Sequence, residues 1–438
     1  MKKVLVAVIF VSSLAFAQDD IRALTILHVN DLHAQLTPTN EGLGGFAYLA
    51  AEVRHQREGC SSCIFLNAGD MVQGTPVSTI YRGAPVYQLA NLLGFDAATV
   101  GNHEFDYGWQ AIQGFARIAH FPLLSANVEN TVGQFLTGKN YVIVNVNNIR
   151  VGIIGLVMGD LRGNYSTPDQ VGPWDVKPVA ETIHRFAAEL KGRADLIVAL
   201  GHLNITEAPA ILAEAPEVSI AILGHLHDGF PEMLHVDHRY AVQEKAYGVE
   251  LGRLEVRFDL TKHEIVSAVW KHIPIDSRKI TPAPDVAAAV QKWESKVSRI
   301  VDVPIGEAKH SFTREEIRPM VEQAMAEATG ADFAFITLGD IRTTIPQGKL
   351  LARNIWNMLP FEDAIVVGTF KGRELPPSIT VRHPVEPDRE YKVAVTRFVA
   401  VNQASPSQLN ATGLKFPTTG PKQRDAMLAW VSRKKVLD

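Results

Sequence analysis

The stretch Leu24-Thr25-Ile26-Leu27-His28-Val29-Asn30-Asp31-Leu32-His33 decides the fold, because an apolar, strand-like run ends abruptly in metal-ligand types of residue. Four later apolar runs end in the same way. Their polar ends contain Asp70, Asn102 with His103, His202, and His225 with His227. In α/β sheets, ligands bind beyond the carboxyl ends of the strands. The sequence therefore predicts one site at which five strand ends meet.

Around these strand ends, short apolar runs alternate with amphipathic segments such as 46–54 and 179–190. This alternation is typical of an α/β fold. The expected strands are 23–29, 63–67, 97–100, 123–126, 141–146, 151–157, 196–200 and 220–223. Residues 248–275 then alternate in the manner of a β-meander.

A proline-rich break, Thr281-Pro282-Ala283-Pro284, follows. Residues 285–300 are predicted to form a helix with Asp285 as its N-cap. A helix over 315–329 and strands over 333–337, 364–370 and 391–396 are expected after it. We therefore expect a first domain over 22–278, a linker helix within 279–300 and a smaller α/β domain over 301–438.

The beginning of the chain predicts export. Lys2 and Lys3 precede an apolar run over 4–14, and Ala15-Phe16-Ala17 forms a cleavage site, so residues 1–17 are expected to be a signal peptide. The run is too short for a membrane anchor. The predicted location is periplasmic or extracellular. There, Cys60 and Cys63 are expected to form a disulfide, with redox and metal roles as the alternatives.

Composition narrows the classes of partner. The 438 residues are 46% hydrophobic and 21% charged, which is ordinary for a globular protein. Their 43 basic and 47 acidic residues give a formal charge of −4. This balance does not predict a nucleic-acid polymer as partner, whereas a small phosphorylated ligand needs only a local site.

The residue types at the strand ends indicate metal chemistry. Carboxylates and imidazoles suit divalent zinc, manganese, iron or cobalt. Asp31 and His33 are two residues apart and can bind one ion, and Asp70 can bridge two. Two such ions can activate water for attack at phosphorus. The glycines before Asp70, Asn102, His202 and His225 are expected to permit sharp turns.

These motifs, together with Gly101-Asn102-His103-Glu104-Phe105-Asp106-Tyr107-Gly108, resemble the calcineurin-like metallophosphoesterases. More narrowly, residues 23–275 are similar to the secreted 5′-nucleotidase family, with its UDP-sugar hydrolases and 2′,3′-cyclic nucleotide phosphodiesterases. The resemblance implies a β-sandwich flanked by helices as the catalytic domain.

The resemblance also implies roles for individual residues. One divalent ion (Zn, Mn, Co, Fe or Mg) would be held by Asp31, His33, Asp70 and His227. A second would be held by Asp70, Asn102, His202 and His225. His103 and Asp106 would form a catalytic dyad, and a metal-bound hydroxide would be the nucleophile.

Residues 301–438 resemble the nucleotide-binding domain of that family in fewer places. Arg342 would contact the phosphate or ribose, and Phe361 and Phe398 would stack on the base. Core packing is the alternative for both phenylalanines. The loop after Phe398 departs from the family pattern, which predicts a weak preference among bases.

The resulting prediction is an exported dimetal phosphohydrolase that converts nucleoside 5′-monophosphates into nucleoside and phosphate. Hydrolysis of 2′,3′-cyclic nucleotides, UDP-sugars or nucleotide pyrophosphates is the alternative within the family. A non-catalytic exported nucleotide-binding protein is the alternative from another class. The complete set of expected metal ligands argues against it.

Overall fold

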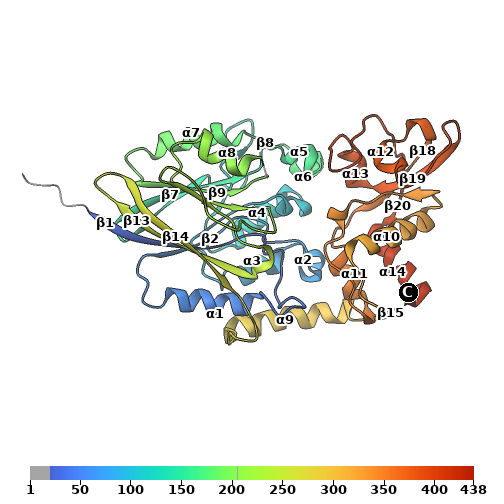
Figure 1. Cartoon of the computed structure of the whole chain (residues 1–438), viewed down its shortest axis with the longest axis horizontal. Helices are drawn as coiled ribbons and strands as arrows, with labels where there is room; N and C mark the ends of the chain where they lie inside the picture. The colour runs from blue at the N-terminus through green and yellow to red at the C-terminus, as the bar shows by residue number, and fades with distance from the viewer. Residues whose placement is uncertain (1–19, 205) are drawn as a thin grey trace, which may run out of the picture.

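The structure is a computed structural model that describes residues 20–204 and 206–438. The predicted signal peptide, residues 1–17, lies outside these residues. Two bodies are visible in Figure 1: a larger one built from the first two thirds of the chain, and a smaller one in orange and red. The gold helix α9 (Pro284–Val301) runs between them along one side.

The first sheet of the larger body contains the strand that opens the described chain. β1 pairs in parallel with β2 and antiparallel with β13, so the order is β14-β13-β1-β2-β3-β4. The strands are β1 (Ile21–Val29), β2 (Cys63–Asn67), β3 (Ala97–Thr99), β4 (Leu123–Leu124), β13 (Glu250–Asp259) and β14 (Glu264–Pro274).

The second sheet has the order β11-β12-β10-β9-β7-β6, with β7, β9 and β10 parallel. Its strands are β6 (Tyr141–Val146), β7 (Ile149–Val157), β9 (Leu196–His202), β10 (Ile220–Gly224), β11 (Leu234–Val236) and β12 (Arg239–Val242). A small antiparallel pair, β5 (Val128–Glu129) and β8 (Asp175–Val176), lies apart from it.

The two sheets pack face to face through one apolar layer. Leu24, Ile26 and Ile64 of the first sheet meet Val151 and Val198 of the second, and all five are buried. Burying such side chains contributes roughly 1.5–3 kcal/mol each. The predicted sandwich is confirmed, and every expected strand of 23–223 has a counterpart in it.

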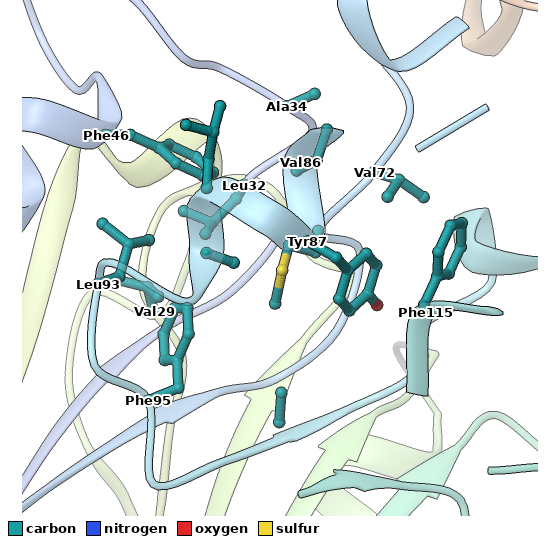
Figure 2. Close-up of a cluster of buried hydrophobic side chains, with 14 of the residues drawn as sticks. Val29, Leu32, Ala34, Phe46, Val72, Val86, Tyr87, Leu93, Phe95 and Phe115 are labelled. Atoms are coloured by element: carbon teal, nitrogen blue, oxygen red, sulfur yellow. The ribbon is translucent and has the colours of Figure 1, made fainter. Parts of the chain in front are cut away.

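Helices cover the outer faces of the sandwich. On the first sheet, Phe46, Tyr87 and Phe115 pack with Val286 and Val290 of α9, and Figure 2 shows part of this cluster. The second sheet is covered through Ile183 and Phe186. The helices are α1 (Phe46–Arg57), α2 (Pro76–Ile80), α3 (Ala84–Ala90), α4 (Trp109–Ile118), α5 (Leu161–Asn164), α6 (Pro168–Val171), α7 (Val179–Leu190) and α8 (Glu207–Glu214), with the 3₁₀ turns η1 (His103–Tyr107) and η2 (Ala246–Gly248).

Helix α9 corrects one detail of the sequence analysis. It begins at Pro284, and Ala283 occupies the N-cap, not Asp285. Proline is favoured in the first turn because its missing N–H has no helical partner there. Asp285 instead accepts hydrogen bonds from the Arg54 guanidinium at 2.7 and 2.8 Å, which ties the helix to α1.

The smaller body has its own apolar core, which includes Ile317, Val321, Ile355 and Trp430. Its sheets have the orders β17-β15-β21 and β16-β19-β18-β20. The strands are β15 (Pro304–Ala308), β16 (Phe333–Ala334), β17 (Gly348–Leu351), β18 (Ala364–Lys371), β19 (Glu390–Thr396), β20 (Thr418–Lys422) and β21 (Val436–Leu437).

The helices of this body include several that the sequence patterns did not predict. Helix α10 begins at a capping box in which the Glu316 N–H donates to Thr313 Oγ1, as expected for a Thr-x-x-Glu start. The helices are α10 (Arg314–Thr329), α11 (Ala352–Met358), α12 (Pro377–Thr380), α13 (Arg397–Val401) and α14 (Gln423–Lys434), with the turns η3 (Leu338–Asp340) and η4 (Gly372–Glu374).

The predicted disulfide is present. Cys60 and Cys63 are bonded, with their Cα atoms 5.6 Å apart, in the tight turn between α1 and β2. Because the two cysteines are three residues apart in the sequence, the disulfide is a local cross-link. Among residues 20–204 and 206–438, no helix is both long enough and apolar enough to cross a bilayer.

Candidate metal centre and substrate cavity

The five predicted strand ends meet at one edge of the sandwich. β1, β2 and β3 lead into Asp31, Asp70 and Asn102 from the first sheet. From the second sheet, β9 ends at His202, and His225 follows β10. Parallel pairing puts the carboxyl ends of neighbouring strands on the same side, which is why residues far apart in the sequence become neighbours.

The first group of possible ligands contains Asp31, His33 and His227, whose ligand atoms lie within 4.8 Å of one another. The Nε2 atoms of His33 and His227 are 3.0 Å apart. Asp31 Oδ1 is 3.5 Å from His227 Nε2. Asp31 and His33 are both buried.

The second group contains Asp70, His202 and His225, under the same 4.8 Å limit. His202 Nε2 lies 3.1 Å from Asp70 Oδ2 and 3.1 Å from Asn102 Oδ1. Asp70 Oδ2 is also 3.8 Å from His33 Nε2 of the first group. Asp70 thus lies between the two groups.

The unpartnered atoms of this edge fit divalent cations. Asp31 Oδ2 accepts hydrogen bonds from the Asn30 amide and the His225 N–H, and Asp70 Oδ1 accepts one from the His103 N–H. The other oxygens, Asp31 Oδ1 and Asp70 Oδ2, are buried and have no hydrogen-bond partner within residues 20–204 and 206–438. Leaving such oxygens unpaired costs free energy, and a cation in each group would offset this cost.

His202 is held in the orientation of a ligand by the backbone. Its Nδ1–H donates to the carbonyl of Ala68 at 2.8 Å, which leaves Nε2 directed at the carboxylate of Asp70. A hydrogen bond from the second ring nitrogen fixes the tautomer and the ring plane of a ligating histidine.

The electrostatic environment favours the neutral imidazole at three of the proposed ligands, His33, His225 and His227. Burial and the nearby Arg342 guanidinium lower the pKa of His227 to about 3 and lower the pKa of His33 well below its usual value. Burial and His202 lower the pKa of His225 to about 3. A neutral imidazole is the form that binds a metal.

Asp70 is held in its ionised form. Burial alone would raise the pKa of Asp70, but His202 and His103 outweigh burial and lower it well below its usual value. Correspondingly, Asp70 and Asp31 overcome the effect of burial and raise the pKa of His202.

Backbone strain is concentrated at this edge. Asp31, His33, Asp70 and His225 have φ values of 50°, 46°, 51° and 87°, in the left-handed region that side chains other than glycine rarely adopt. Strained backbone of this kind persists where the surrounding structure fixes it, typically at functional sites.

Gly101 and Gly224 are required for a reason other than the predicted sharp turn: each leaves room for a neighbouring loop to approach closely. A Cβ at Gly101 would lie 2.1 Å from Asp70 Oδ1, and one at Gly224 would lie 2.3 Å from the Ala68 carbonyl oxygen. Neither has a positive φ. The close approach of ligand loops therefore requires glycine at both positions.

His103 and Asp106 form a hydrogen-bonded pair beside the two groups. Their Nδ1 and Oδ2 atoms are 2.9 Å apart, on the 3₁₀ turn η1 that follows β3. Nε2 of His103 lies 4.0 Å from Asp70 Oδ2. Burial would lower the pKa of His103, but Asp106 and Asp70 outweigh burial and raise it.

Glu104 is a buried acidic residue of this motif to which the sequence analysis gave no role. Its carboxylate accepts from the N–H groups of Asp70, Met71 and Gly101 at 3.1, 2.8 and 2.6 Å. The hydroxyl of Tyr87 donates to it at 3.3 Å. Glu104 therefore joins the loops after β2 and β3, and only the three-dimensional contacts show it.

The smaller body closes over this edge and leaves a cavity of about 690 Å³. Arg342, Phe361 and Phe398 all line it. The Arg342 guanidinium lies 3.3 Å from His33 Nε2, and the Phe361 ring is centred 5.8 Å from the His103 ring. Both phenylalanines are half-buried and face the cavity, which contradicts core packing for them.

The sequence analysis assigned no role to the other residues of the cavity wall. Asp363 Oδ2 accepts the N–H of Phe398 at 2.7 Å and so positions the start of α13. The two bodies are joined near the wall by the Arg397–Asp169 ion pair at 2.9 Å. Further lining residues are Gln73, Arg82, Tyr107, Tyr165, Gln408 and Lys422.

Comparisons with known proteins agree with this arrangement. Residues 24–229 match the family Calcineurin-like phosphoesterase, and residues 301–383 match the family 5'-nucleotidase, C-terminal domain. A 5′-nucleotidase precursor from Thermus thermophilus has a similar fold, with a TM-score of 0.83 and 23% identity over 95% of this chain and 97% of that one.

Two curated relatives extend the comparison. An endonuclease of Bacillus subtilis is 25% identical over 93% of this chain and 39% of its own length. The 5′-nucleotidase of Bos taurus is 31% identical over 65% of this chain and 54% of its own length. The chain thus spans 39% and 40% of the first two curated relatives that it matches.

The sandwich edge and the second body together define the class: a phosphoesterase domain followed by a smaller domain that closes over its ligand edge. The two matched regions are those of a calcineurin-like phosphoesterase domain, over residues 24–229, followed by a 5′-nucleotidase C-terminal domain, over residues 301–383.

Proposed function

We propose that the chain is a dimetal phosphohydrolase whose main substrates are nucleoside 5′-monophosphates, cleaved to nucleoside and phosphate. The observation that carries this proposal is the shared cavity, which is lined by Asn102, His103 and His225 of the metal edge on one side and by Arg342, Phe361 and Phe398 on the other. The similarity to the bovine 5′-nucleotidase supports the substrate class.

The proposed metal ligands are divided by the geometry of the edge. Asp31, His33 and His227 would hold one ion, and Asn102, His202 and His225 the other, with Asp70 shared. When bound, two divalent ions activate water and neutralise charge on the phosphoryl oxygens. Identification of the ions requires metal analysis of the purified protein.

His103 would act on the phosphate directly. A protonated His103 can donate a hydrogen bond to a phosphoryl oxygen as charge develops there. Asp106, 2.9 Å from Nδ1, orients the ring and favours the protonated form. Hydrogen bonding and proton transfer by positioned side chains typically contribute 10²–10⁴-fold in rate.

The smaller domain would select the substrate. Arg342 would pair with the phosphate or the ribose, because its guanidinium already lies 3.3 Å from a ligand histidine. The rings of Phe361 and Phe398 offer apolar faces for a nucleobase. In this proposal, residues 22–278 form the catalytic domain, 279–300 the linker helix and 301–438 the substrate-binding domain, and residues 1–17 direct export.

Phosphodiester hydrolysis is the second candidate, favoured by the similarity to the Bacillus subtilis endonuclease. It would use the same metal edge. Its substrates would be small diesters such as 2′,3′-cyclic nucleotides or nucleotide pyrophosphates, since the cavity is bounded by the second body.

The test compares kcat/KM for AMP, 2′,3′-cyclic AMP, UDP-glucose and bis-p-nitrophenyl phosphate, with each of several divalent metals. We expect AMP to be the best of the four. A higher value for any diester or pyrophosphate would replace the first candidate with the second. Nucleotide binding without turnover of any of them would identify the non-catalytic alternative.

A further inference from the structure

Three further ligand-type residues meet away from the proposed dimetal centre. Glu244 follows β12, Glu250 opens β13 and His272 lies near the end of β14. In the β13–β14 pairing, Glu250 is opposite Pro274 and His272 is opposite Gly252. Glu250 and His272 are therefore diagonal neighbours on one face of the hairpin, within reach of each other.

The ligand atoms of the trio lie within 4.8 Å of one another. His272 Nδ1 is 2.9 Å from Glu244 Oε2 and 3.9 Å from Glu250 Oε2. The Trp270 ring, centred 4.2 Å from the His272 ring, fixes the imidazole from the side. The arrangement brings two carboxylates and one imidazole nitrogen to a common point.

Glu244 provides an independent indication of a ligand. It is 0% exposed, and its Oε1 has no hydrogen-bond partner among the described residues. Burial, together with the nearby Glu250 carboxyl, raises the pKa of Glu244 to about 7, against the opposing effect of His272. Two facing carboxylates repel each other, and a cation between them would remove the repulsion.

The nearby ammonium group does not fill this role. Lys245 Nζ pairs with Glu250 Oε1 at 2.9 Å, and the Lys245 side chain is 55% exposed. Lys245 therefore occupies Oε1 of Glu250, while Oε2 of Glu250 lies on the side of His272, 3.9 Å from its Nδ1. Lys245 is thus paired with Glu250, and Glu244 Oε1 still has no hydrogen-bond partner among the described residues.

We propose that Glu244, Glu250 and His272 bind a third divalent transition-metal ion. Two carboxylate oxygens and an imidazole nitrogen are a donor set that suits manganese or zinc. Water can complete the coordination, because the His272 side chain is 35% exposed.

The ion would stabilise the segment that positions Asp31. The side chain of Asn30 bonds both backbone groups of Glu244, at 2.9 and 3.0 Å, and its amide donates to Asp31 Oδ2 at 2.7 Å. An ion on Glu244 would therefore fix the residue that holds Asn30. Its role is structural, since the trio is separate from the substrate cavity.

The test counts Mn²⁺ ions bound per chain by the loss of the free-ion electron paramagnetic resonance signal. Compared with wild type, His272→Gln and Glu250→Gln are each expected to bind one ion fewer. The matched control is His184→Gln, because His184 and Glu217 form a similar pair, 3.0 Å apart, and the part of the chain that the structure describes adds no third ligand to them. This control should bind as many ions as wild type.

The difference between variants does not depend on the proposed function, because the measurement counts bound ions and requires no turnover. Equal counts for wild type, His272→Gln and Glu250→Gln would overturn the third site and leave the trio a buried ion pair. Circular dichroism checks that the variants are folded. If His272→Gln does not fold, the partly exposed Glu250→Gln decides by the same count.

Discussion

The two walls of the cavity differ in how they are built. On the side of the proposed metal centre, Asp31, Asp70 and His202 follow or end buried strands and are themselves buried. On the other wall, Phe361 lies in the loop before β18 and Phe398 in the first turn of the short helix α13, and both are half-buried. The residues proposed to bind metal are thus held at buried strand ends, whereas the residues proposed to bind the substrate lie on a loop and a short helix that are partly exposed.

The largest expected effect follows from removing the residue shared by both metal groups. Asp70→Asn takes one negative charge from between two dications, so both ions should bind more weakly and turnover should fall with them. Metal content after dialysis and kcat for AMP measure the two losses. A variant that retains both ions and full turnover would contradict the shared role of Asp70.

The variant His103→Asn should lower the turnover rate without lowering the amount of bound metal. His103 is outside both ligand groups, so metal content should be unchanged, while kcat should fall by about 10²–10⁴-fold. Metal analysis beside steady-state kinetics checks the division. If His103→Asn lost metal as Asp70→Asn does, the assignment of His103 as a catalytic residue would be wrong.

A substitution in the opposite wall should change the selectivity among substrates and leave the metal content of the protein unchanged. Stacking a base on an aromatic ring contributes roughly 1–3 kcal/mol, so Phe361→Ala should reduce the preference for AMP over ribose 5-phosphate by about tenfold to a hundredfold. The matched control is Phe416→Ala in the same domain, since Phe416 packs against Phe370. A wild-type preference above about a thousandfold would contradict the weak base recognition predicted from the sequence.

Asp363, which lines the same wall, is expected to make the stability of the folded chain depend on pH. Burial raises the pKa of Asp363 from its ordinary 3.8 to about 6. Between these values the folded chain binds more protons than the unfolded chain, so stability falls as the pH rises. At 1.36 kcal/mol per unit, the loss is up to about 3 kcal/mol.

Asp363→Asn removes this titration and retains an oxygen for the Phe398 N–H. Urea unfolding should therefore show the variant gaining stability relative to wild type between pH 4 and pH 7.5. The same free-energy difference at both pH values would show that Asp363 is not titrating in this range.

The smallest expected effect is at the disulfide. The loop between Cys60 and Cys63 is very short, so the bridge constrains the unfolded chain little. The double variant Cys60→Ser/Cys63→Ser should keep its metal content and its kcat for AMP, with a slightly lower melting temperature. Loss of activity would indicate a role for the cysteines beyond the local cross-link.

The sequence predicted the two walls unequally, for physical reasons. On the metal edge, each strand and its ligand are adjacent in the chain, so Asp31 or Asn102 can be recognised from a short motif. Glu104 was missed because its partners are backbone N–H groups of other loops. Glu244 and His272 were missed because only the pairing of β13 with β14 and the fold around β12 bring them together.

The same reasoning explains the unpredicted elements of the smaller domain. Strand β20 and helix α14 follow a segment with little apolar periodicity, and they are stabilised by tertiary packing of residues such as Met427 and Trp430. The buried Arg424 lies 3.7 Å from the centre of the Trp356 ring, a contact that no local pattern indicates. Local propensity is a weak guide where distant contacts determine the structure.

The central claim is that two ions at the sandwich edge enable this chain to release phosphate from nucleoside 5′-monophosphates. The most direct measurement is phosphate release from AMP by chelator-treated protein as one divalent metal is added back. The account predicts no release without metal and full activity when both ion sites formed by Asp31, His33, Asp70, Asn102, His202, His225 and His227 are filled. Undiminished release from metal-free protein, or no release at any metal loading, would contradict it.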